Sequence, residues 1–236
     1  MKKNKRRKFW VILTIILLCF VIIGVLNFEK IQGYFAGQLS NNRTEMRNAR
    51  NNRQKHKPDY NLQHVQPISP ELLIKAWRNR QDYRSVGQIA IKDQNILLNI
   101  YRGCGNNELA LGAGTFRRNQ RMGKNNYPIA AHNMDDARTY FSPLFSAASN
   151  GSLKKGTTIF LTDFKKVYFY RLVEYKFISI YNLNLSYNSK KYAKSPVVTL
   201  FTCDYTGQGR LYIKGKLTGS QSLESASKYV KSVFLI

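Results

Sequence analysis

The stretch from residue 197 to residue 217, VVTLFTCDYTGQGRLYIKGKL, most strongly limits what this chain can fold into. An apolar, β-branched run ends on Cys203, a turn-rich segment follows, and a second run begins at Arg210. The second run alternates apolar and polar side chains, which is typical of a half-buried strand. Two such runs joined by a short loop that contains glycine predict a β-hairpin.

The hairpin also contains a candidate nucleophile. Cys203 is expected where a buried strand reaches the surface, and Arg210 opens the strand that faces it. A fixed cation beside a thiol favours the thiolate. The one histidine within the predicted domain, His132, follows the apolar run YPIAA and is also expected at a strand end. Cysteine and histidine residues far apart in sequence can meet in a fold, so the residues alone leave a Cys–His enzyme and a structural histidine equally open.

Short strand-like segments recur throughout the domain. They are GQIAI, NILLNIY, NELALGAGTF, YPIAAH, TTIFLTD and KVYFYRLVEYKFIS, with Gly, Asn and Asp turns between them. Many short strands at this spacing predict an all-β barrel or sandwich. A chain of 236 residues is long enough for one such core and an N-terminal extension.

Helical patterns are few in this domain. One helix is expected from residue 70 to residue 84, with Ser69 as its N-cap and Pro70 in its first turn. Its side chains that share a face and should pack on the domain are Leu72, Leu73, Ala76 and Trp77. A second helix is expected from residue 136 to residue 150.

The N-terminus predicts a membrane anchor. Residues 1–8 are mostly basic, and residues 9–26 carry no charge. At about 1.5 Å per residue this run reaches about 27 Å, close to the hydrocarbon thickness of about 30 Å. A cleaved signal peptide is the alternative, but its apolar region is usually about 7–15 residues, and the polar sequence NFEK follows here instead of a cleavage site. The basic cluster predicts a cytoplasmic N-terminus and an extracytoplasmic remainder.

The anchor defines a four-part division: a basic tail (1–8), an anchor (9–26), a basic stalk (27–68) and a folded domain (69–236). The stalk is rich in Asn, Gln and Arg, which favours a solvated connector over an arm that lies on anionic lipid or wall polymer. His56 and His64 fall in this segment and are expected to be exposed. The net charge of +25 fits either a solvated surface or an anionic partner such as nucleic acid, lipid or cell wall.

The sequence gives no sign of a metal or nucleotide site. It contains no CxxC or HExxH motif, no cluster of metal ligands and no glycine-rich phosphate loop. Its three cysteines give no disulfide framework. Cys104, between two glycines, is expected in an exposed loop and is interpreted as incidental. Neither a metal nor a cofactor is predicted.

Three motifs resemble the sortase family in order and spacing. They are TLFTC with Arg210 after it, AAHNM with His132, and LALGAGTF. The likeness covers about residues 85–218 and is closest to class A sortases. It implies a closed eight-stranded β-barrel with a few short helices, and a cysteine transpeptidase of the Gram-positive cell surface. Such an enzyme cuts a Leu-Pro-x-Thr-Gly-like (LPXTG) sorting signal of surface proteins between Thr and Gly. It holds the Thr carbonyl as a thioester and passes this acyl group to an amine of a peptidoglycan precursor similar to lipid II.

The resemblance also implies roles for individual residues. Cys203 would be the nucleophile, His132 the acid that protonates the leaving amine, and Arg210 the group that positions the substrate and stabilises the oxyanion. Residues two apart share a face of a strand, so Phe201 and Ala130 should flank the cysteine and histidine and line the groove. Thr202 would add a hydroxyl donor or be a satisfied strand threonine.

Some positions depart from the family pattern. Ala131 replaces a glycine, and Lys92 and Asn99 replace prolines of the first two strands. Glu108 is the one carboxylate near the expected groove, and the expected lid loop, residues 182–194, has none. Because calcium prefers six or more oxygen ligands, no calcium requirement is predicted.

Two other functions remain as alternatives. One is a non-catalytic basic barrel that binds cell-wall polymer. The other, an L,D-transpeptidase, requires an SHGC-like element that this sequence lacks. The basic surface is expected to meet lipid and wall polymers, with no nucleic-acid partner.

Overall fold

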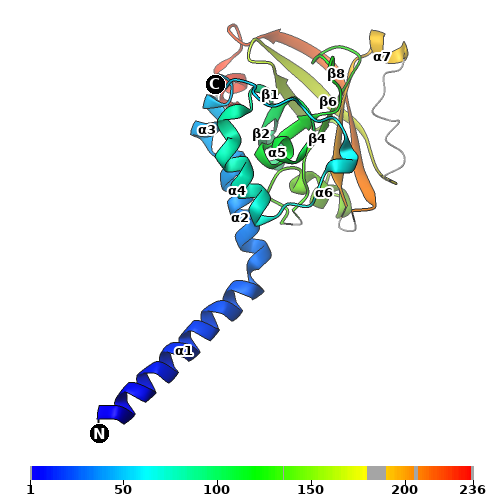
Figure 1. Ribbon diagram of the computed structural model, residues 1–236. Coiled ribbons are helices and arrows are strands. Elements are labelled where there is room, and N and C mark those ends of the chain that lie inside the picture. The colour runs from blue at the N-terminus through cyan, green and yellow to red at the C-terminus, as the bar shows by residue number, and fades with distance from the viewer. Residues whose placement is uncertain (1, 135, 180–189, 205–206, 235–236) are drawn as a thin grey trace.

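Eight strands form a closed barrel in the computed structural model, which describes residues 2–134, 136–179, 190–204 and 207–234 (Figure 1). Their order around the barrel is β1-β2-β3-β4-β7-β8-β6-β5. The strands are β1 (Ser85–Ile91), β2 (Ile96–Tyr101), β3 (Ala113–Thr115), β4 (Asn126–Ala130), β5 (Thr158–Thr162), β6 (Lys166–Ser179), β7 (Val197–Cys203) and β8 (Gly209–Ser222). The all-β prediction is confirmed, and it is the barrel alternative that the chain adopts.

The barrel is held by antiparallel pairs, with two parallel contacts at β2–β3 and β4–β7. Alternate side chains point inward, as the pleat requires. On β7 these are Val198 and Leu200, which pack in the central core together with Ile129 of β4 and Ile213 of β8. On the outward face, a buried hydrogen bond from Thr199 Oγ1 to Asn126 Oδ1 (2.8 Å) joins β7 to β4. The β-hairpin expected at residues 197–217 is the β7–β8 pair.

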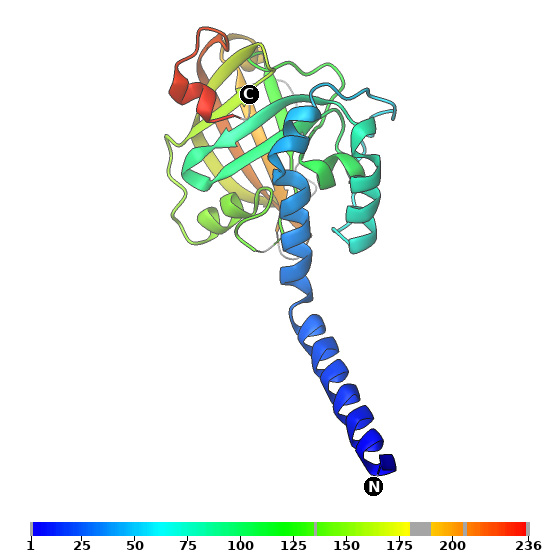
Figure 2. The ribbon, with the colours of Figure 1, turned by 90° about the vertical axis from the view of Figure 1, so that its left-hand side faces the viewer.

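Helices extend from the barrel or cover it. They are α1 (Lys2–Leu26), α2 (Phe28–Asn41), α3 (Arg43–Asn48), α4 (Pro70–Asn79), α5 (Asn106–Leu111), α6 (Ser142–Ser149), α7 (Lys190–Lys194) and α8 (Lys228–Ser232). Short 3-10 turns are η1 (Leu62–His64), η2 (Arg80–Asp82) and η3 (Lys92–Gln94). Figures 1 and 2 show α1 projecting away from the rest of the molecule. Within the described residues, one helix is long and apolar enough to cross a membrane, over Arg7–Leu26.

Helix α4 has the predicted start, and one of the four side chains of its predicted face, Trp77, does not pack on the domain. The Ser69 hydroxyl accepts the N–H of Leu72 at 3.2 Å, as expected of an N-cap. Leu73 and Ala76 are buried, whereas Trp77 is 55% exposed. The Trp77 prediction was therefore wrong, because this side chain points away from the barrel and the guanidinium of Arg80 lies 4.7 Å from its ring centre.

The second predicted helix is shorter than expected. Helix α6 begins at Ser142 instead of residue 136. The Asp136 carboxylate accepts the N–H groups of Arg138 and Thr139 at 2.8 Å each, which holds this segment in a turn. A side chain that satisfies nearby backbone N–H groups competes with the helix, so the helix starts later.

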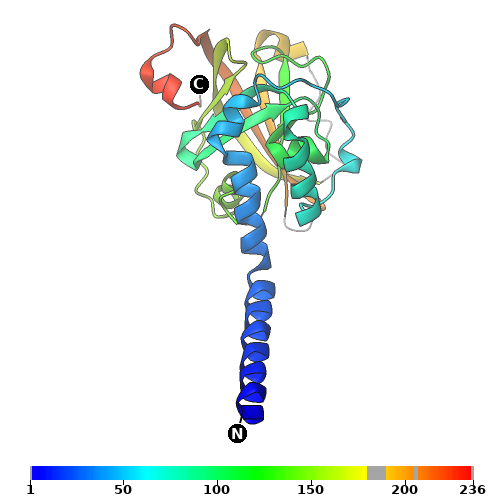
Figure 3. The same cartoon turned by 60° about the vertical axis from the view of Figure 1, so that its left-hand side comes forward.

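The segment predicted as a solvated stalk packs on the barrel instead. Figure 3 shows α2 running along the side of the barrel, and Ala36, Met46 and Ala49 in this segment are buried. The side chain of Asn99, on β2, donates to the carbonyl of Met46 at 3.0 Å. Small residues on the inner side of α2, such as Gly33 and Ala36, allow this close approach.

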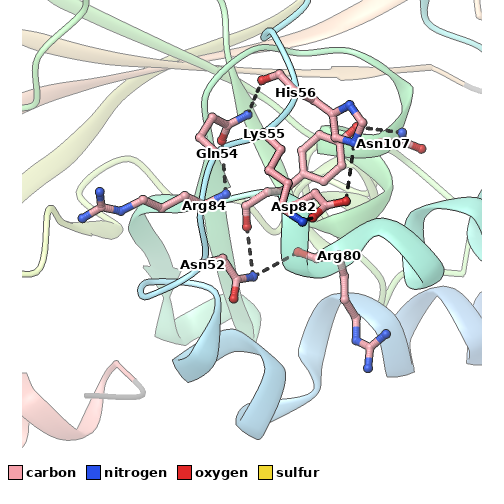
Figure 4. Close-up of polar contacts among 9 residues, drawn as sticks. Asn52, Gln54, Lys55, His56, Arg80, Asp82, Arg84 and Asn107 are labelled. Atoms are coloured by element: carbon pink, nitrogen blue, oxygen red, sulfur yellow. Dashed lines mark hydrogen bonds and ion pairs between the residues drawn. The ribbon is translucent and has the colours of Figure 1, made fainter.

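Polar side chains fasten the chain after α3 to the end of α4 (Figure 4). Asn52 Nδ2 donates to the carbonyls of Arg80 (3.0 Å) and Tyr83 (3.1 Å), and Lys55 forms an ion pair with Asp82 at 2.6 Å. His56 is exposed, as expected, and its ring stacks on Tyr83 with ring centres 5.1 Å apart. Asparagine and lysine in this stretch therefore bind backbone carbonyls and a carboxylate.

Candidate active site

The parallel β4–β7 pair brings the predicted histidine and cysteine to one end of the barrel. Its register pairs Ala130 with Phe201, and each candidate follows its partner by two residues. The pairing continues past the strand ends, because Ala131 N donates to Phe201 O at 3.2 Å and Asn133 Nδ2 donates to Cys203 O at 3.2 Å. His132 and Cys203 therefore end neighbouring strands on the same face.

The antiparallel β7–β8 pair adds the arginine. Cys203 pairs directly with Arg210, and directly paired residues project from the same face of a sheet. Arg210 Nη1 donates to the carbonyls of Gly207 (2.8 Å) and Gly209 (2.7 Å). Among the residues with described positions, these bonds use Nη1, and the N–H groups on Nε and Nη2 can donate to a further acceptor.

The imidazole of His132 is held in an apolar environment. Its side chain is buried against Tyr140, with ring centres 5.7 Å apart, and its backbone carbonyl accepts the N–H of Phe141. Burial lowers the pKa of His132 from 6.5 to about 4, because the charged form loses its hydration. Within the described part of the chain, the buried Nε2 atom has no hydrogen-bond partner. A neutral imidazole with one unsatisfied nitrogen is suited to exchanging a proton with a substrate or a thiol.

The two predicted groove residues are covered. Phe201 is buried between Phe116 and Tyr212, with ring centres 5.0 Å and 5.7 Å away. Ala130 is buried beside Cys104, with Leu62 of η1 packed on the same cluster. Phe201 and Ala130 therefore form an apolar layer next to Cys203 that other side chains cover.

Thr202 lies on the other face of β7. Strand alternation turns its side chain inward with Val198 and Leu200, away from Cys203. Its hydroxyl is buried and has no partner among the residues that the structure describes. Among those residues the Thr202 hydroxyl is therefore not satisfied, unlike the strand threonine considered from sequence. It also lies on the opposite face of β7 from Cys203.

Sequence analysis missed three contributors to the site. Asn133 extends the β4–β7 pairing to the cysteine, Tyr140 buries the histidine, and Tyr212 packs on Phe201. Asn133 directly follows His132 in the AAHNM motif, so its position near the site could have been predicted from the sequence. The contacts of Tyr140 and Tyr212 depend on how the chain returns to the strands, which no local pattern reveals.

No metal centre is formed by the residues with described positions, since no group of three His, Cys, Asp or Glu side chains comes together there. Glu108 is buried, which raises the pKa of its carboxyl group. Residues 182–189 of the expected lid loop lie outside the described residues, so the expectation that calcium is not required stays a prediction. Cys104 is fully buried rather than exposed, and burial raises the pKa of its thiol to about 12.

Comparison with known proteins gives a consistent result. A family model described as "Sortase domain" matches residues 89–218. The chain is 31% identical to "Sortase A" of Streptococcus agalactiae, over 94% of this chain and 90% of that protein. It is 32% identical to "Sortase A" of Listeria monocytogenes, over 73% and 75% of the two chains.

Solved structures show the same fold. The crystal structure of Listeria monocytogenes sortase A superposes with a TM-score of 0.56 at 31% identity, covering 64% of this chain and 97% of that chain. Sortase C-3 of Streptococcus pneumoniae superposes with a TM-score of 0.56 at 17% identity, covering 87% and 100%. At that identity the second match supports the fold alone.

Proposed function

The chain belongs to the sortase family of cysteine transpeptidases, and we propose that it cuts an LPXTG-like sorting signal between Thr and Gly. The acyl group held as a thioester in this step would be passed to an amine of a peptidoglycan precursor similar to lipid II, which releases the thiol. Surface proteins that carry the signal are the proposed substrates.

Two strand registers support Cys203, His132 and Arg210 as the catalytic residues. The β4–β7 register runs on to His132 and Cys203, and the β7–β8 register pairs Cys203 with Arg210. Amide cleavage by a thiol needs a nucleophile, a proton donor for the amine and a donor for the oxyanion. These three side chains supply one of each.

In the first half-reaction, Cys203 Sγ attacks the Thr carbonyl carbon while its proton passes to the imidazole of His132. Negative charge moves to the carbonyl oxygen, where N–H donors of Arg210 stabilise it. The C–N bond then breaks, the imidazolium protonates the leaving amine, and a thioester remains on the sulfur. The apolar environment that lowers the pKa of His132 makes its imidazolium a strong acid, which favours this protonation.

In the second half-reaction, the acceptor amine attacks the thioester carbon and loses a proton to the neutral imidazole. The oxyanion forms again beside Arg210, and the C–S bond breaks. The new amide leaves, and the sulfur recovers a proton from the imidazolium. Guanidinium suits position 210 because it stays charged and offers several N–H donors in a fixed plane.

The N-terminal helix and the sortase relatives are consistent with a membrane-anchored cell-surface protein. We propose that residues 9–26 cross the membrane once, with residues 1–8 in the cytoplasm and the catalytic domain, 69–236, outside. Residues 27–68 would connect the two while lying against the barrel.

Cleavage of a quenched sorting-signal peptide by the full chain in detergent micelles tests the proposal. Wild type should cleave the peptide, and Cys203→Ala, His132→Ala and Arg210→Ala should each lower the rate at least about 10²-fold. Cys104→Ala is the matched control, because it removes a buried thiol that is not one of the three proposed catalytic groups, and it should keep the activity. Adding an amine acceptor should convert the hydrolysis product into a longer peptide. Equal cleavage by Cys203→Ala would refute the mechanism.

A further inference from the structure

An exposed apolar surface lies on helices α2 and α4, outside the candidate active site. We call it the juxtamembrane face, and it consists of Phe28, Ile31, Tyr34, Phe35, Ile74 and Trp77, each at least 44% exposed. Together with Pro70 and Leu73, most of these side chains line a groove of about 600 Å³. Large apolar side chains that gather in this way on a surface indicate a binding partner.

The inner side of α2 is already used, so these side chains cannot turn inward. Gly33, Ala36 and Ser40 on that side are buried. The hydroxyl of Thr139 donates to the carbonyl of Gly33 at 3.4 Å. The juxtamembrane face is therefore a permanent outer surface of the folded chain.

The face lies next to the segment that is apolar enough to span the membrane. Helix α1 ends at Leu26 and α2 begins at Phe28. Asn27 between them has φ −111° and ψ 13°, outside the helical range, and the two helices meet at a bend (Figure 1). Gln32 Nε2 donates to the carbonyl of Ile68 at 2.6 Å, which holds the start of α4 beside the second turn of α2.

The bend decides whether the face reaches lipid. An upright α2 would lift Phe35 about 14 Å beyond the end of α1. The headgroup layer is only about 5–8 Å deep on each side of the hydrocarbon core, so an upright helix would carry Phe35 past it. An oblique α2 keeps these side chains nearer the bilayer. In Figure 1, α1 approaches from the lower left, and α2 and α4 lie on that side of the barrel.

The chemistry of the face fits the interface between lipid and water. Tyrosine and tryptophan are enriched at this depth, where an apolar ring and a polar edge are both accommodated, and phenylalanine is common on the apolar face of interfacial helices. Lys30 and Lys75 are exposed on the same helices, but so are Glu29 and Glu71. Because the charges are mixed, the apolar side chains and not net charge determine the partner.

We propose that the juxtamembrane face rests in the headgroup layer of the same bilayer that α1 spans. The domain is then held on the membrane at two places, by α1 and by the α2–α4 face, instead of rotating about a single helix. This inference rests on the anchorage by residues 9–26 proposed above.

Quenching by lipids brominated near the top of their acyl chains tests the proposal in the full chain, reconstituted in vesicles of phosphatidylcholine and phosphatidylglycerol. The chain has two tryptophans, Trp10 in the span and Trp77 in the face. Replacing both by Phe and adding Phe35→Trp places one reporter in the face. Tyr229→Trp in the same background is the matched control, since Tyr229 is similarly exposed (55%) but lies on α8 at the far end of the barrel from α1 (Figures 1 and 2).

We expect brominated lipid to lower the emission of the Phe35→Trp reporter at least about twofold, as for a side chain seated in the interface, and to leave the Tyr229→Trp reporter unchanged. Trp77→Phe alone leaves Trp10 as the test of insertion. If Trp10 is quenched but position 35 behaves like position 229, the docking proposal is overturned while the anchor stands. Blue-shifted emission from position 35 without quenching would mean that protein covers the face, such as a second copy, and also overturns it. An unquenched Trp10 overturns both the anchor and the docking.

Discussion

Acidification should destabilise the protein through His132. The imidazole is buried, and burial lowers the pKa of His132 from 6.5 to about 4 in the folded chain. In the unfolded chain the same group returns to water and to its ordinary pKa. Between these two values the unfolded state binds a proton that the folded state does not. The stabilising contribution is therefore complete above about pH 6.5 and is lost as the pH falls towards 4.

The size of the effect follows from the two pKa values. A shift of one pKa unit corresponds to about 1.4 kcal/mol. At pH 7 both states are nearly neutral at this position, whereas at pH 5 the unfolded state is almost fully protonated. The free energy of unfolding should thus fall by about 2 kcal/mol between pH 7 and pH 5 because of this one residue.

Urea denaturation of the full chain in micelles at pH 7 and pH 5 measures this loss. Glu108 acts with the opposite sign, because burial raises the pKa of its carboxyl group and makes the folded state the stronger proton binder. The comparison with His132→Gln removes such background, because both chains share it. His64→Gln is the matched substitution at an exposed imidazole.

The reasoning fails if His132→Gln loses as much free energy between pH 7 and pH 5 as wild type does. A direct measurement does not depend on that variant being stable. NMR of ¹⁵N-labelled histidine should show the His132 ring still neutral at pH 5. A protonation midpoint near 6.5 would contradict the burial argument.

Three further outcomes are expected. Arg210→Lys should lower peptide cleavage about 10²-fold while leaving Cys203 open to a small alkylating reagent, because one ammonium replaces a planar set of donors; mass spectrometry and the cleavage assay measure both. Asn126→Ala should lower the free energy of unfolding by about 1–3 kcal/mol, since it removes the acceptor of a buried hydrogen bond from the Thr199 hydroxyl. Thr199→Val should lower the free energy of unfolding less in the Asn126→Ala chain than in the wild-type chain. Additive losses would contradict this. Iodoacetamide at pH 7 should modify Cys203 and spare Cys104, whose thiol is buried and has a pKa of about 12.

Local patterns were sufficient where local forces decide the structure. Alternation and turn residues predicted the β7–β8 hairpin, and the Ser69–Pro70 pair predicted the start of α4, because each depends on neighbours within a few residues. The approach of His132 to Cys203 depends on the parallel pairing of β4 with β7. Strand pairing over so long a separation has no local signature, so the resemblance to a family was needed to connect the two.

Composition misled where polar residues bond to the protein. A segment rich in Asn and Arg is expected in water, yet Asn52 satisfies two backbone carbonyls at the end of α4. The prediction that Trp77 packs on the domain was wrong for the opposite reason, because an apolar side chain is exposed. A helix pattern shows which side chains share a face, but not whether the barrel, lipid or water lies opposite them. The width of the buried stripe is decided by the elements that pack against it.

The packing of α2 has a consequence for the site, because the loop after His132 is held from two directions. At one end Phe141 N donates to the carbonyl of His132, and the ring of Tyr140 lies against the imidazole. At the other end Thr139 contacts Gly33 of α2. A displacement of α2 therefore reaches the imidazole through one short loop. Cys203 is held both by its pairing with Arg210 and by Asn133, so membrane contacts of α2 would act on the proposed proton donor before they act on the proposed nucleophile.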